Sequence, residues 1–242
     1  MTAPEFRTPD GTPVPAVSAD EMREIDRIAV EDLGLGLLQM MENAGRDLAG
    51  RVLERDPDSV TVLAGNGGNG GGGLACGRHL ENRGVSVTVV LDRPADALDG
   101  AAATQYRILD EAGVRVADAD ASLADDETDV VVDALVGYGL TGAPRGRARD
   151  LIERCGNVDT TLVSLDVPSG LDATTGDRPG PVVEPDETVT LALPKSGLSE
   201  VECELTLADI AIPRTVYDRA GIEYDIPFER SYCVPLTPAS NS

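Results

Sequence analysis

The stretch that decides the fold reads VTVLAGNGGNGGGGLACGRHL and covers residues 60–80. Its β-branched beginning, residues 60–63, predicts a buried strand, residues 65–73 predict a glycine loop, and residues 74–80 are compatible with a helix. A strand, a glycine loop and a helix in this order direct unpaired backbone N–H groups and the positive end of a helix dipole at an anion, usually a phosphate. Seven of the nine loop residues are glycines, which permit the close approach and positive φ angles that such a loop requires. We therefore expect a phosphate-binding loop.

The same loop contains the pattern G-x-G-x-x-G over residues 65–70. The next apolar run, residues 85–91, ends in Asp92, about where a dinucleotide-binding Rossmann domain keeps the acid that binds ribose. A glycine-rich segment matches this pattern easily, so the pattern by itself is weak evidence. It makes a nicotinamide-type dinucleotide a first hypothesis for the ligand.

Length and composition indicate one large α/β domain, because 242 residues can bury a substantial core. No apolar run is long enough to cross a bilayer and no signal-peptide pattern is present, so we expect a soluble, cytoplasmic protein without a membrane partner. The four cysteines are widely spaced and are typical of small packing residues rather than metal ligands or disulfides. A single histidine, His79, argues against zinc and is more typical of packing than of catalysis.

The formal net charge of −23 is the unusual property of the chain. Excess carboxylate, few aromatic residues and one lysine are typical of proteins that work in molar salt, where screening reduces self-repulsion. This halophile-like composition leaves no basic patch, which argues against nucleic acid as a partner.

Along the chain, residues 1–17 contain four prolines and predict an extended or disordered arm. Ser18 and Glu21 form a capping-box pattern that predicts the start of a helix. After residues 34–36 a second helix is expected, and Asn43 is a polar exception on it. The apolar face expected for this second helix comprises Leu37, Leu38, Met41, Ala44, Leu48 and Val52.

From there on, expected strands alternate with helices. The expected strands are residues 60–64, 85–91, 114–116, 129–135, 161–166, 188–193 and 205–212, and the expected helices between them end near residues 80, 112 and 155. This alternation predicts a Rossmann-like, doubly wound, mostly parallel sheet with helices on both faces, in which ligands bind at the carboxyl ends of strands. We expect a single domain, residues 18–230, followed by a tail, residues 231–242.

Four segments meet at those strand ends: the glycine loop, the segment that begins at Asp133, the turn after Asp166, and the segment around Lys195. Asp133 lies inside an otherwise apolar strand, and a buried carboxylate must be paired or bound to a cation. Lys195 is the one lysine in a chain that otherwise uses arginine. Since lysine acts as a compact point charge or proton carrier, we favour a functional role over chance.

At these segments the chain resembles the NAD(P)H-hydrate epimerase family, the YjeF N-terminal domain. The resemblance is carried by MMENAG (40–45), GNGGNGGGGLACGRHL (65–80), DALVGYGLTGAPRG (133–146), SLDVPSGLDATTG (164–176), LPKSGL (193–198) and ADIAIPRTVY (208–217). It implies interconversion of the R and S hydrates of NADH and NADPH (NADHX and NADPHX) at C6 of the nicotinamide ring. A partner dehydratase that depends on ADP or ATP would then recover the cofactor. The oligomeric state stays open, with a homodimer as one alternative.

The resemblance also implies site residues. Potassium ligands would be Asn69, Asp133 and Ser169, and oxygen ligands of this kind suit an alkali cation. Asp166 would lie near the altered ring and exchange protons with it, with Lys195 tuning its charge or orienting the ligand. The dinucleotide would lie along Gly68, Asn69, Gly70, Gly71, Gly72, Gly137, Tyr138, Gly139, Leu140, Thr141, Gly142 and Ala143.

The chain departs from the family pattern N-N-G-G-D at two positions, where Gly68 and Gly72 replace an asparagine and an acid. This places the loop contacts in question more than the reaction. Two alternatives remain open: an NAD-dependent oxidoreductase, which rests on G-x-G-x-x-G and Asp92, and a non-catalytic nucleotide-binding scaffold of the same fold. Retention of Asp133, Asp166 and Lys195 favours the epimerase.

Overall fold

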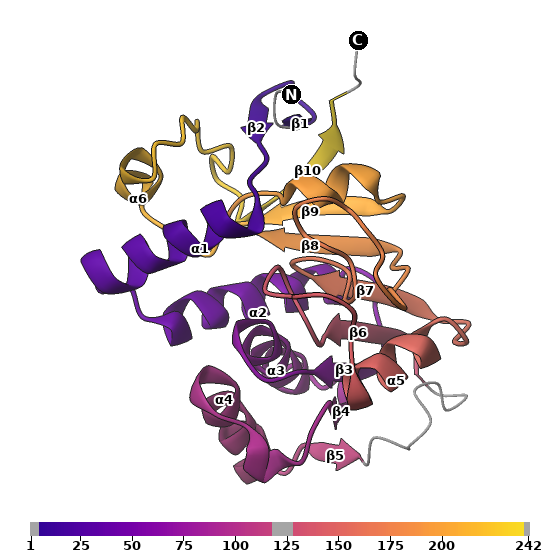
Figure 1. The fold of residues 1–242 in the computed structure, drawn as a ribbon. Helices are drawn as coiled ribbons and strands as arrows, with labels where there is room; N and C mark the ends of the chain where they lie inside the picture. Colours follow the sequence, from indigo (N-terminus) through magenta and orange to yellow (C-terminus); the bar gives the residue numbers. More distant parts are fainter. Residues whose placement is uncertain (1–4, 118–127, 240–242) are drawn as a thin grey trace.

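A computed structural model describes residues 5–117 and 128–239 of the chain (Figure 1). Its centre is a ten-stranded sheet in the order β2-β1-β10-β9-β8-β7-β6-β3-β4-β5. The strands are β1 (Glu5–Arg7), β2 (Pro13–Pro15), β3 (Ser59–Ala64), β4 (Ser86–Leu91), β5 (Arg115–Ala117), β6 (Val130–Ala134), β7 (Thr161–Leu165), β8 (Glu187–Leu191), β9 (Glu204–Ala208) and β10 (Cys233–Pro238). All neighbours from β5 to β9 pair in parallel, and β10, β1 and β2 continue the sheet antiparallel.

Helices cover both faces of this sheet (Figure 1). They are α1 (Ala19–Arg27), α2 (Leu37–Leu53), α3 (Gly68–Glu81), α4 (Gly100–Glu111), α5 (Gly146–Cys155) and α6 (Arg214–Arg219). Alternate residues of β6 divide between two cores: Val130 and Val132 pack with α2 and α3, whereas Val131 packs with α5. This division is the signature of a strand buried on both faces, and it confirms the doubly wound, mostly parallel fold.

Local sequence signals predict the helices α1 and α2, although two residues of α2 differ from the expected burial. Ser18 and Glu21 form the expected reciprocal capping box at the start of α1. On α2 the inner positions are buried as expected, but Leu37 and Leu38 are 41% and 42% exposed, so their assignment to the buried face was wrong. They lie in the first turn of α2, beyond the edge of the core. Asn43 is half-buried and donates to the Ile210 carbonyl oxygen.

The glycine stretch folds differently from the expected loop. Helix α3 begins at Gly68, so only residues 65–67 form the loop and the following glycines are helical. A Cβ atom at Gly70 would lie 1.7 Å from the Gly65 carbonyl oxygen, and one at Gly73 would lie 2.4 Å from Ala134 Cβ. Glycine costs about 1 kcal/mol relative to alanine inside a helix. It is nevertheless required here, because α3 starts directly against the ends of β3 and β6.

Described segments near both ends of the chain form strands of the sheet, so they are not a separate arm and tail. Residues 1–4 and 240–242 lie outside the described residues. Strand β1 pairs with β10, and β10 pairs with β9, so the proposed boundaries at residues 17 and 231 do not mark the edge of the folded sheet. Their prolines suit these positions because the strands are short and lie near a sheet edge.

Two of the four cysteines pack into the interior of the protein. Cys76 and Cys155 are buried, and all four cysteines are free thiols. Within residues 5–117 and 128–239, no helix combines the length and the apolar character that a membrane crossing requires.

Candidate functional site

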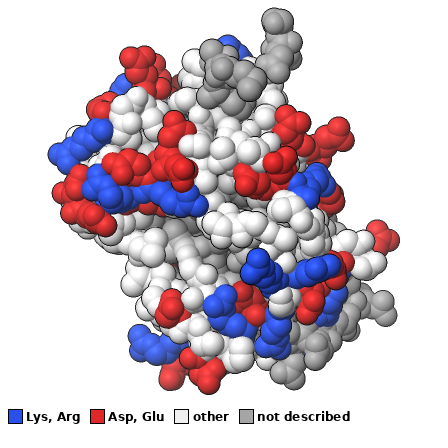
Figure 2. All heavy atoms as spheres, viewed as in Figure 1, with Lys and Arg blue, Asp and Glu red and all other residues white. Residues whose placement is uncertain are grey.

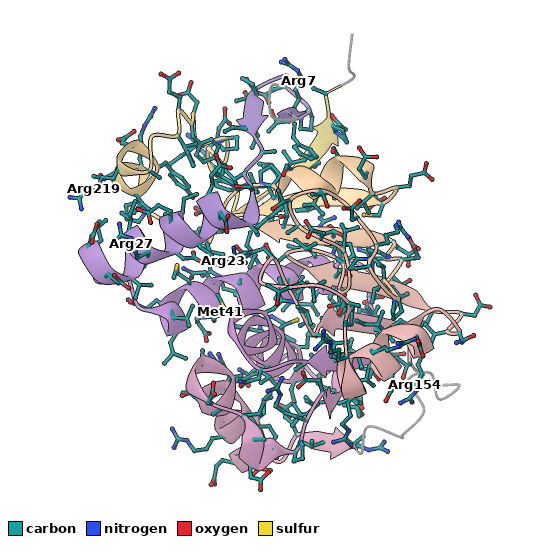
Figure 3. The ribbon with its side chains drawn as sticks, viewed as in Figure 1. Arg7, Arg23, Arg27, Met41, Arg154 and Arg219 are labelled. Atoms are coloured by element: carbon teal, nitrogen blue, oxygen red, sulfur yellow. The ribbon has the colours of Figure 1, made fainter. Side chains whose placement is uncertain are left out.

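A cavity of about 720 Å³ opens at the carboxyl ends of the parallel strands. Its floor comes from the segments that follow β3, β4, β6, β7 and β8, and its walls from α1 and α2. Figure 3 labels Arg23 and Arg27 on α1 and Met41 between α2 and α3, and all three line the cavity. A volume of this size suits a small molecule or a nucleotide.

The strand order places the cavity at a topological switch point. From β3 the chain proceeds outward through β4 to β5, and it then returns to β6 on the opposite side of β3. Connections therefore diverge between β3 and β6, which leaves a crevice beyond their carboxyl ends. The residues that line it there are Asn66, Gly67, Gly68 and Asn69 after β3, and Leu135, Val136, Gly137, Tyr138 and Gly139 after β6.

Asp166 directly follows β7 and is held in an uncommon backbone conformation. Its φ angle is +69°, and its side chain is almost fully buried. One carboxylate oxygen, Oδ2, accepts from the backbone N–H of Tyr138 at 3.0 Å. The other oxygen, Oδ1, accepts from the ammonium group of Lys195. A non-glycine residue in the left-handed region costs free energy, and such residues cluster at functional sites.

Lys195 is fully buried, with 0% of its surface exposed. Besides Asp166, its ammonium group donates to the Leu191 carbonyl oxygen at 2.9 Å and lies 5.7 Å from the centre of the Tyr138 ring. A buried ammonium group is tolerated only with a charged partner and further hydrogen bonds. The structure thus brings the single lysine and Asp166 together as a buried ion pair that faces the cavity.

Tyr138 connects this pair to α1. Its hydroxyl group donates to the Asp26 carboxylate, while its backbone N–H holds Asp166. Burial raises the pKa of Asp26, an effect that the hydrogen bond from Tyr138 and the nearby Lys195 charge oppose. Burial, followed by the Asp26 charge, raises the pKa of Tyr138, so the phenol stays protonated and acts as the donor.

Asp133 and Ser169 lie together beneath the cavity floor, where both are 0% exposed. The Asp133 carboxylate accepts from Ser164 Oγ at 2.8 Å, Ser169 Oγ at 2.6 Å, Ser169 N–H at 2.9 Å and Leu135 N–H at 3.2 Å. All four donors are neutral, and burial raises the Asp133 pKa above its ordinary value. The carboxylate is therefore fully hydrogen-bonded, but these partners do not balance its charge.

Asn69 is the second residue of α3 and lines the cavity beside Gly137. One end of its amide is 3.2 Å from the Leu165 carbonyl oxygen, and the other is 3.3 Å from the Gly137 backbone nitrogen. With its nitrogen toward Leu165, the amide makes a hydrogen bond at each end. In that orientation protein groups satisfy both ends of the amide. The Asn69 amide oxygen, the Asp133 carboxylate and the Ser169 hydroxyl group are all oxygen donors, and this donor type fits an alkali cation.

The structure brings together only part of the expected dinucleotide contacts. Gly68, Asn69, Gly137, Tyr138, Gly139, Asp166 and Lys195 line the cavity. Gly70, Gly71 and Gly72 are buried inside α3, and Leu140, Thr141, Gly142 and Ala143 lie farther along the loop after β6, outside the lining. Contact of these seven residues with a bound ligand stays a prediction.

The two glycines that depart from the family pattern have different surroundings. A Cβ atom at Gly68 would lie 3.5 Å from Met41 Sδ, which is an ordinary contact. A Cβ atom at Gly72 would lie 2.8 Å from Leu165 Cδ2, so a side chain there requires Leu165 to move. Gly72 is thus a packing residue between α3 and β7, and Gly68 is the one whose replacement changes the cavity surface.

Helix α1 contributes residues that the sequence analysis missed. Met22, Arg23, Asp26 and Arg27 all line the cavity. In the sequence, Asp26 directly follows Ile25, which is buried. An acid beside a buried position could have indicated that Asp26 has a hydrogen-bond partner. By contrast, His79 bonds to Glu42 at 2.9 Å outside the cavity lining, as expected of a packing histidine.

The charge balance inside the cavity differs from that of the chain. Four basic side chains (Arg23, Arg27, Arg93, Lys195) and three acidic ones (Asp26, Asp92, Asp166) line it, although the chain carries a net charge of −23. Figure 2 shows acidic and basic side chains along the upper rim of a mostly uncharged hollow. A cavity without net negative charge can admit an anionic ligand that the rest of the surface would repel.

Comparisons with known proteins agree on one family. The family described as YjeF-related protein N-terminus matches residues 37–197. An NAD(P)H-hydrate epimerase of Dehalogenimonas lykanthroporepellens is 46% identical over 241 residues, which cover 96% of this chain and 97% of that protein. A bifunctional NAD(P)H-hydrate repair enzyme Nnr of Hyperthermus butylicus is 39% identical, but its match covers 82% of this chain and 38% of that protein. The crystal structure of yeast ynu0 superposes with a TM-score of 0.81 at 26% identity, covering 91% of this chain and 99% of that one.

Proposed function

This chain belongs to the family of YjeF-related protein N-termini, and we propose that it is an isomerase that epimerises the R and S forms of NAD(P)H hydrate at C6 of the nicotinamide ring. The family match and the epimerase named above, which aligns over nearly the whole chain, support this function. The single structural observation that carries it is the buried Asp166–Lys195 pair at the cavity floor. The assignment places the protein in the repair of damaged nicotinamide cofactors.

The proposed reaction needs a group that exchanges protons with oxygen on a carbon beside nitrogen. The lone pair of the ring nitrogen forms a C=N bond as the C6–O bond breaks, with the bonding electrons leaving on oxygen. The departing hydroxyl takes a proton and leaves as water. Water then adds to C6 from the opposite face and returns a proton, so that atoms and charge balance over the cycle.

Asp166 and Lys195 would carry this proton as a pair. The ammonium group supplies the proton through the Asp166 carboxylate or directly, and the incoming water restores it. The left-handed backbone of Asp166 and the Tyr138 N–H hold the carboxylate in place before the substrate arrives. Because the substrate also epimerises without catalysis, a few kcal/mol of transition-state stabilisation suffice, and each 1.4 kcal/mol gives about a tenfold rate increase.

The dinucleotide would lie across the strand ends with its pyrophosphate near the start of α3. The first N–H groups of a helix lack partners within the helix and carry its positive dipole end. Gly67 and Gly68 line the cavity at this point, and Gly137 presents its backbone opposite them, beside Asn69 and Asp166. These small residues leave the backbone accessible to a ligand.

We assign potassium to the Asn69, Asp133 and Ser169 site. A cation there would supply the positive charge that the neutral donors around Asp133 do not. Since Gly137 lies beside Asn69, loss of the cation would loosen the loop that positions Tyr138 and Asp166.

The decisive experiment is a chromatographic assay that resolves the R and S epimers of NADHX and of NADPHX, starting from mixtures of the epimers. We expect acceleration of the interconversion in potassium and less acceleration at equal ionic strength in sodium. Equal rates in both salts would remove the potassium assignment but leave the epimerase intact. A rate no faster than the uncatalysed one in either salt would refute the proposed function.

The two other hypotheses have less support. The oxidoreductase hypothesis rests on the glycine pattern and Asp92 alone, and among the described residues that line the cavity there is no histidine to accept the alcohol proton. A non-catalytic scaffold would have no use for a buried lysine–aspartate pair in a strained conformation. Absence of a change in absorbance at 340 nm on mixing with NAD and candidate alcohols would count against the oxidoreductase, and epimerase turnover would exclude the scaffold.

We further propose that an ADP- or ATP-dependent dehydratase consumes the epimer that this protein makes. The match to part of a relative named as bifunctional supports this pairing of activities. A coupled assay would test it: adding this protein should raise the fraction of mixed hydrates that a dehydratase converts from about one half to nearly all.

A further inference from the structure

Asp92 and Arg93 are among the charged residues of the cavity that the proposed mechanism does not use. Asp92 directly follows β4, and its backbone N–H donates to the Ala64 carbonyl oxygen at 3.1 Å, which anchors it beside the loop that leads into α3. Both side chains line the same cavity as Asp166. Strands β4 and β7 are separated by β3 and β6, so Asp92 and Asp166 are roughly 14 Å apart along the sheet edge, at about 4.8 Å per strand.

The start of α3 lies between these two ends of the cavity. In order along the strand ends come the Asp166–Lys195 pair, the glycines at the start of α3, and then Asp92 with Arg93. A dinucleotide has the same order of parts: a reactive ring, a pyrophosphate and an adenosine ribose. With the ring at Asp166, the adenosine ribose reaches the end of the cavity where Asp92 and Arg93 lie.

Asp92 and Arg93 form a planar, two-bond ion pair. Arg93 Nε donates to Oδ1 at 2.8 Å and Nη2 donates to Oδ2 at 2.9 Å. The Asp92 side chain is 7% exposed, whereas that of Arg93 is 39% exposed, so the acid is fixed and the guanidinium can turn outward. A carboxylate accepts hydrogen bonds from a ribose 2′-hydroxyl, and a guanidinium binds a 2′-phosphate.

We infer that Asp92 and Arg93 form the subsite for the adenosine ribose and determine the preference of this protein between NADHX and NADPHX. Asp92 binds the 2′-hydroxyl of NADHX while Arg93 stays paired with it. Arg93 turns to the 2′-phosphate of NADPHX and shields that phosphate from the Asp92 carboxylate. This inference rests on the proposed function for its substrates, but the subsite itself is defined by the adenosine half alone.

The test uses two conservative substitutions that act in opposite directions. Arg93→Gln should lower the ratio of kcat/KM for NADPHX to kcat/KM for NADHX about tenfold, because it removes charge-assisted hydrogen bonds to the 2′-phosphate. Asp92→Asn should raise the same ratio several-fold. It removes the repulsion between the Asp92 carboxylate and the 2′-phosphate of NADPHX, and it weakens the hydrogen bond from the 2′-hydroxyl group of NADHX. Arg149→Gln serves as the control, since Arg149 forms a similar ion pair with Glu153 on the surface of α5.

A binding measurement separates this inference from the proposed function. Calorimetry with 2′,5′-ADP and 5′-AMP should show that the intact protein binds both and that Arg93→Gln selectively loses affinity for 2′,5′-ADP. That result together with absent epimerase activity would refute the function and keep the subsite. If both variants are active and neither changes the NADPHX-to-NADHX ratio of kcat/KM by more than twofold, the subsite is overturned and the proposed function is kept.

Discussion

Asp166 shows at the scale of one residue how the site is prepared before a ligand binds. Its φ angle of +69° costs about 1–3 kcal/mol for a residue with a side chain. This conformation turns the carboxylate away from the strand and between the Tyr138 N–H and the Lys195 ammonium group. The carboxylate is therefore oriented by the fold, which would reduce the reorganisation that the proposed reaction requires.

Replacing Asp166 by asparagine should reduce the rate of epimerisation by about 10²–10⁴-fold, the usual contribution of a proton-transferring group. Dinucleotide affinity should change little, because the amide keeps the size of the side chain. Epimer-resolved chromatography and equilibrium binding of ADP-ribose would measure the two effects. Asp150→Asn on the exposed surface of α5 is the control, and unchanged turnover in Asp166→Asn would exclude Asp166 from the mechanism.

Asp47 is a buried acid that the catalytic site does not use. Burial, reinforced by the nearby Asp209 charge, raises the pKa of Asp47 to about 7, and Arg46 at 3.7 Å only partly opposes this. Among the described residues, its Oδ2 atom has no hydrogen-bond partner. The folded state therefore holds a proton that the unfolded state releases near pH 4.

This difference predicts that stability decreases as pH rises from about 4 to 7, since the native state binds more protons over that range. Asp47→Asn should remove this contribution and raise the free energy of unfolding by about 1–3 kcal/mol at pH 8. Urea unfolding of both proteins at pH 5, 6, 7 and 8 would measure it. The difference in the free energy of unfolding between Asp47→Asn and the unsubstituted protein should increase with pH. A difference that is the same at all four pH values would contradict the raised pKa of Asp47.

At the scale of elements, the position of α3 depends on glycines in two helices. A Cβ atom at Gly45 of α2 would lie 2.5 Å from Ala75 Cβ and 2.6 Å from the Gly72 carbonyl oxygen. Gly72 in turn packs against Leu165, the residue before Asp166. The close contact of α2 with α3 thus fixes where the amino end of α3 meets the cavity.

Gly45→Ala should therefore destabilise the protein by about 1–3 kcal/mol, because the added methyl group meets backbone atoms that cannot move freely. It should also weaken ADP-ribose binding by displacing α3. Gly50→Ala in the same helix is a matched control, since nothing lies within 4 Å of its Cβ position. That variant should be stabilised by about 0.5–1 kcal/mol. Equal urea midpoints for the two variants would contradict this packing argument.

At the scale of the whole molecule, a cavity with more basic than acidic side chains lies within a chain of net charge −23. Surface repulsion of this size acts against the compact state, and salt screens it because the Debye length falls from about 10 Å at 0.1 M to about 3 Å at 1 M. Figure 2 shows basic side chains interspersed with the acidic ones around the hollow.

Raising NaCl from 0.1 M to 2 M should therefore stabilise the fold by about 2 kcal/mol, or roughly 4–8 °C in Tm for a chain of this length. KCl should do the same and add a further increase if potassium binds the Asn69 site, because a ligand of the native state raises its stability. Differential scanning calorimetry in matched series of the two salts would separate the effects. A Tm that falls with salt would contradict the electrostatic argument.

The sequence by itself determined the alternation of strands and helices, the doubly wound sheet, and the gathering of Asp133, Asp166 and Lys195 at strand ends. These follow from local periodicity and from the rule that parallel strands end at one edge. Only the tertiary structure decided that the glycines after residue 67 are helical, that both chain ends join the sheet, and that α1 lines the site. Each depends on contacts between distant segments, such as Tyr138 with Asp26, 112 residues apart, which no local pattern encodes.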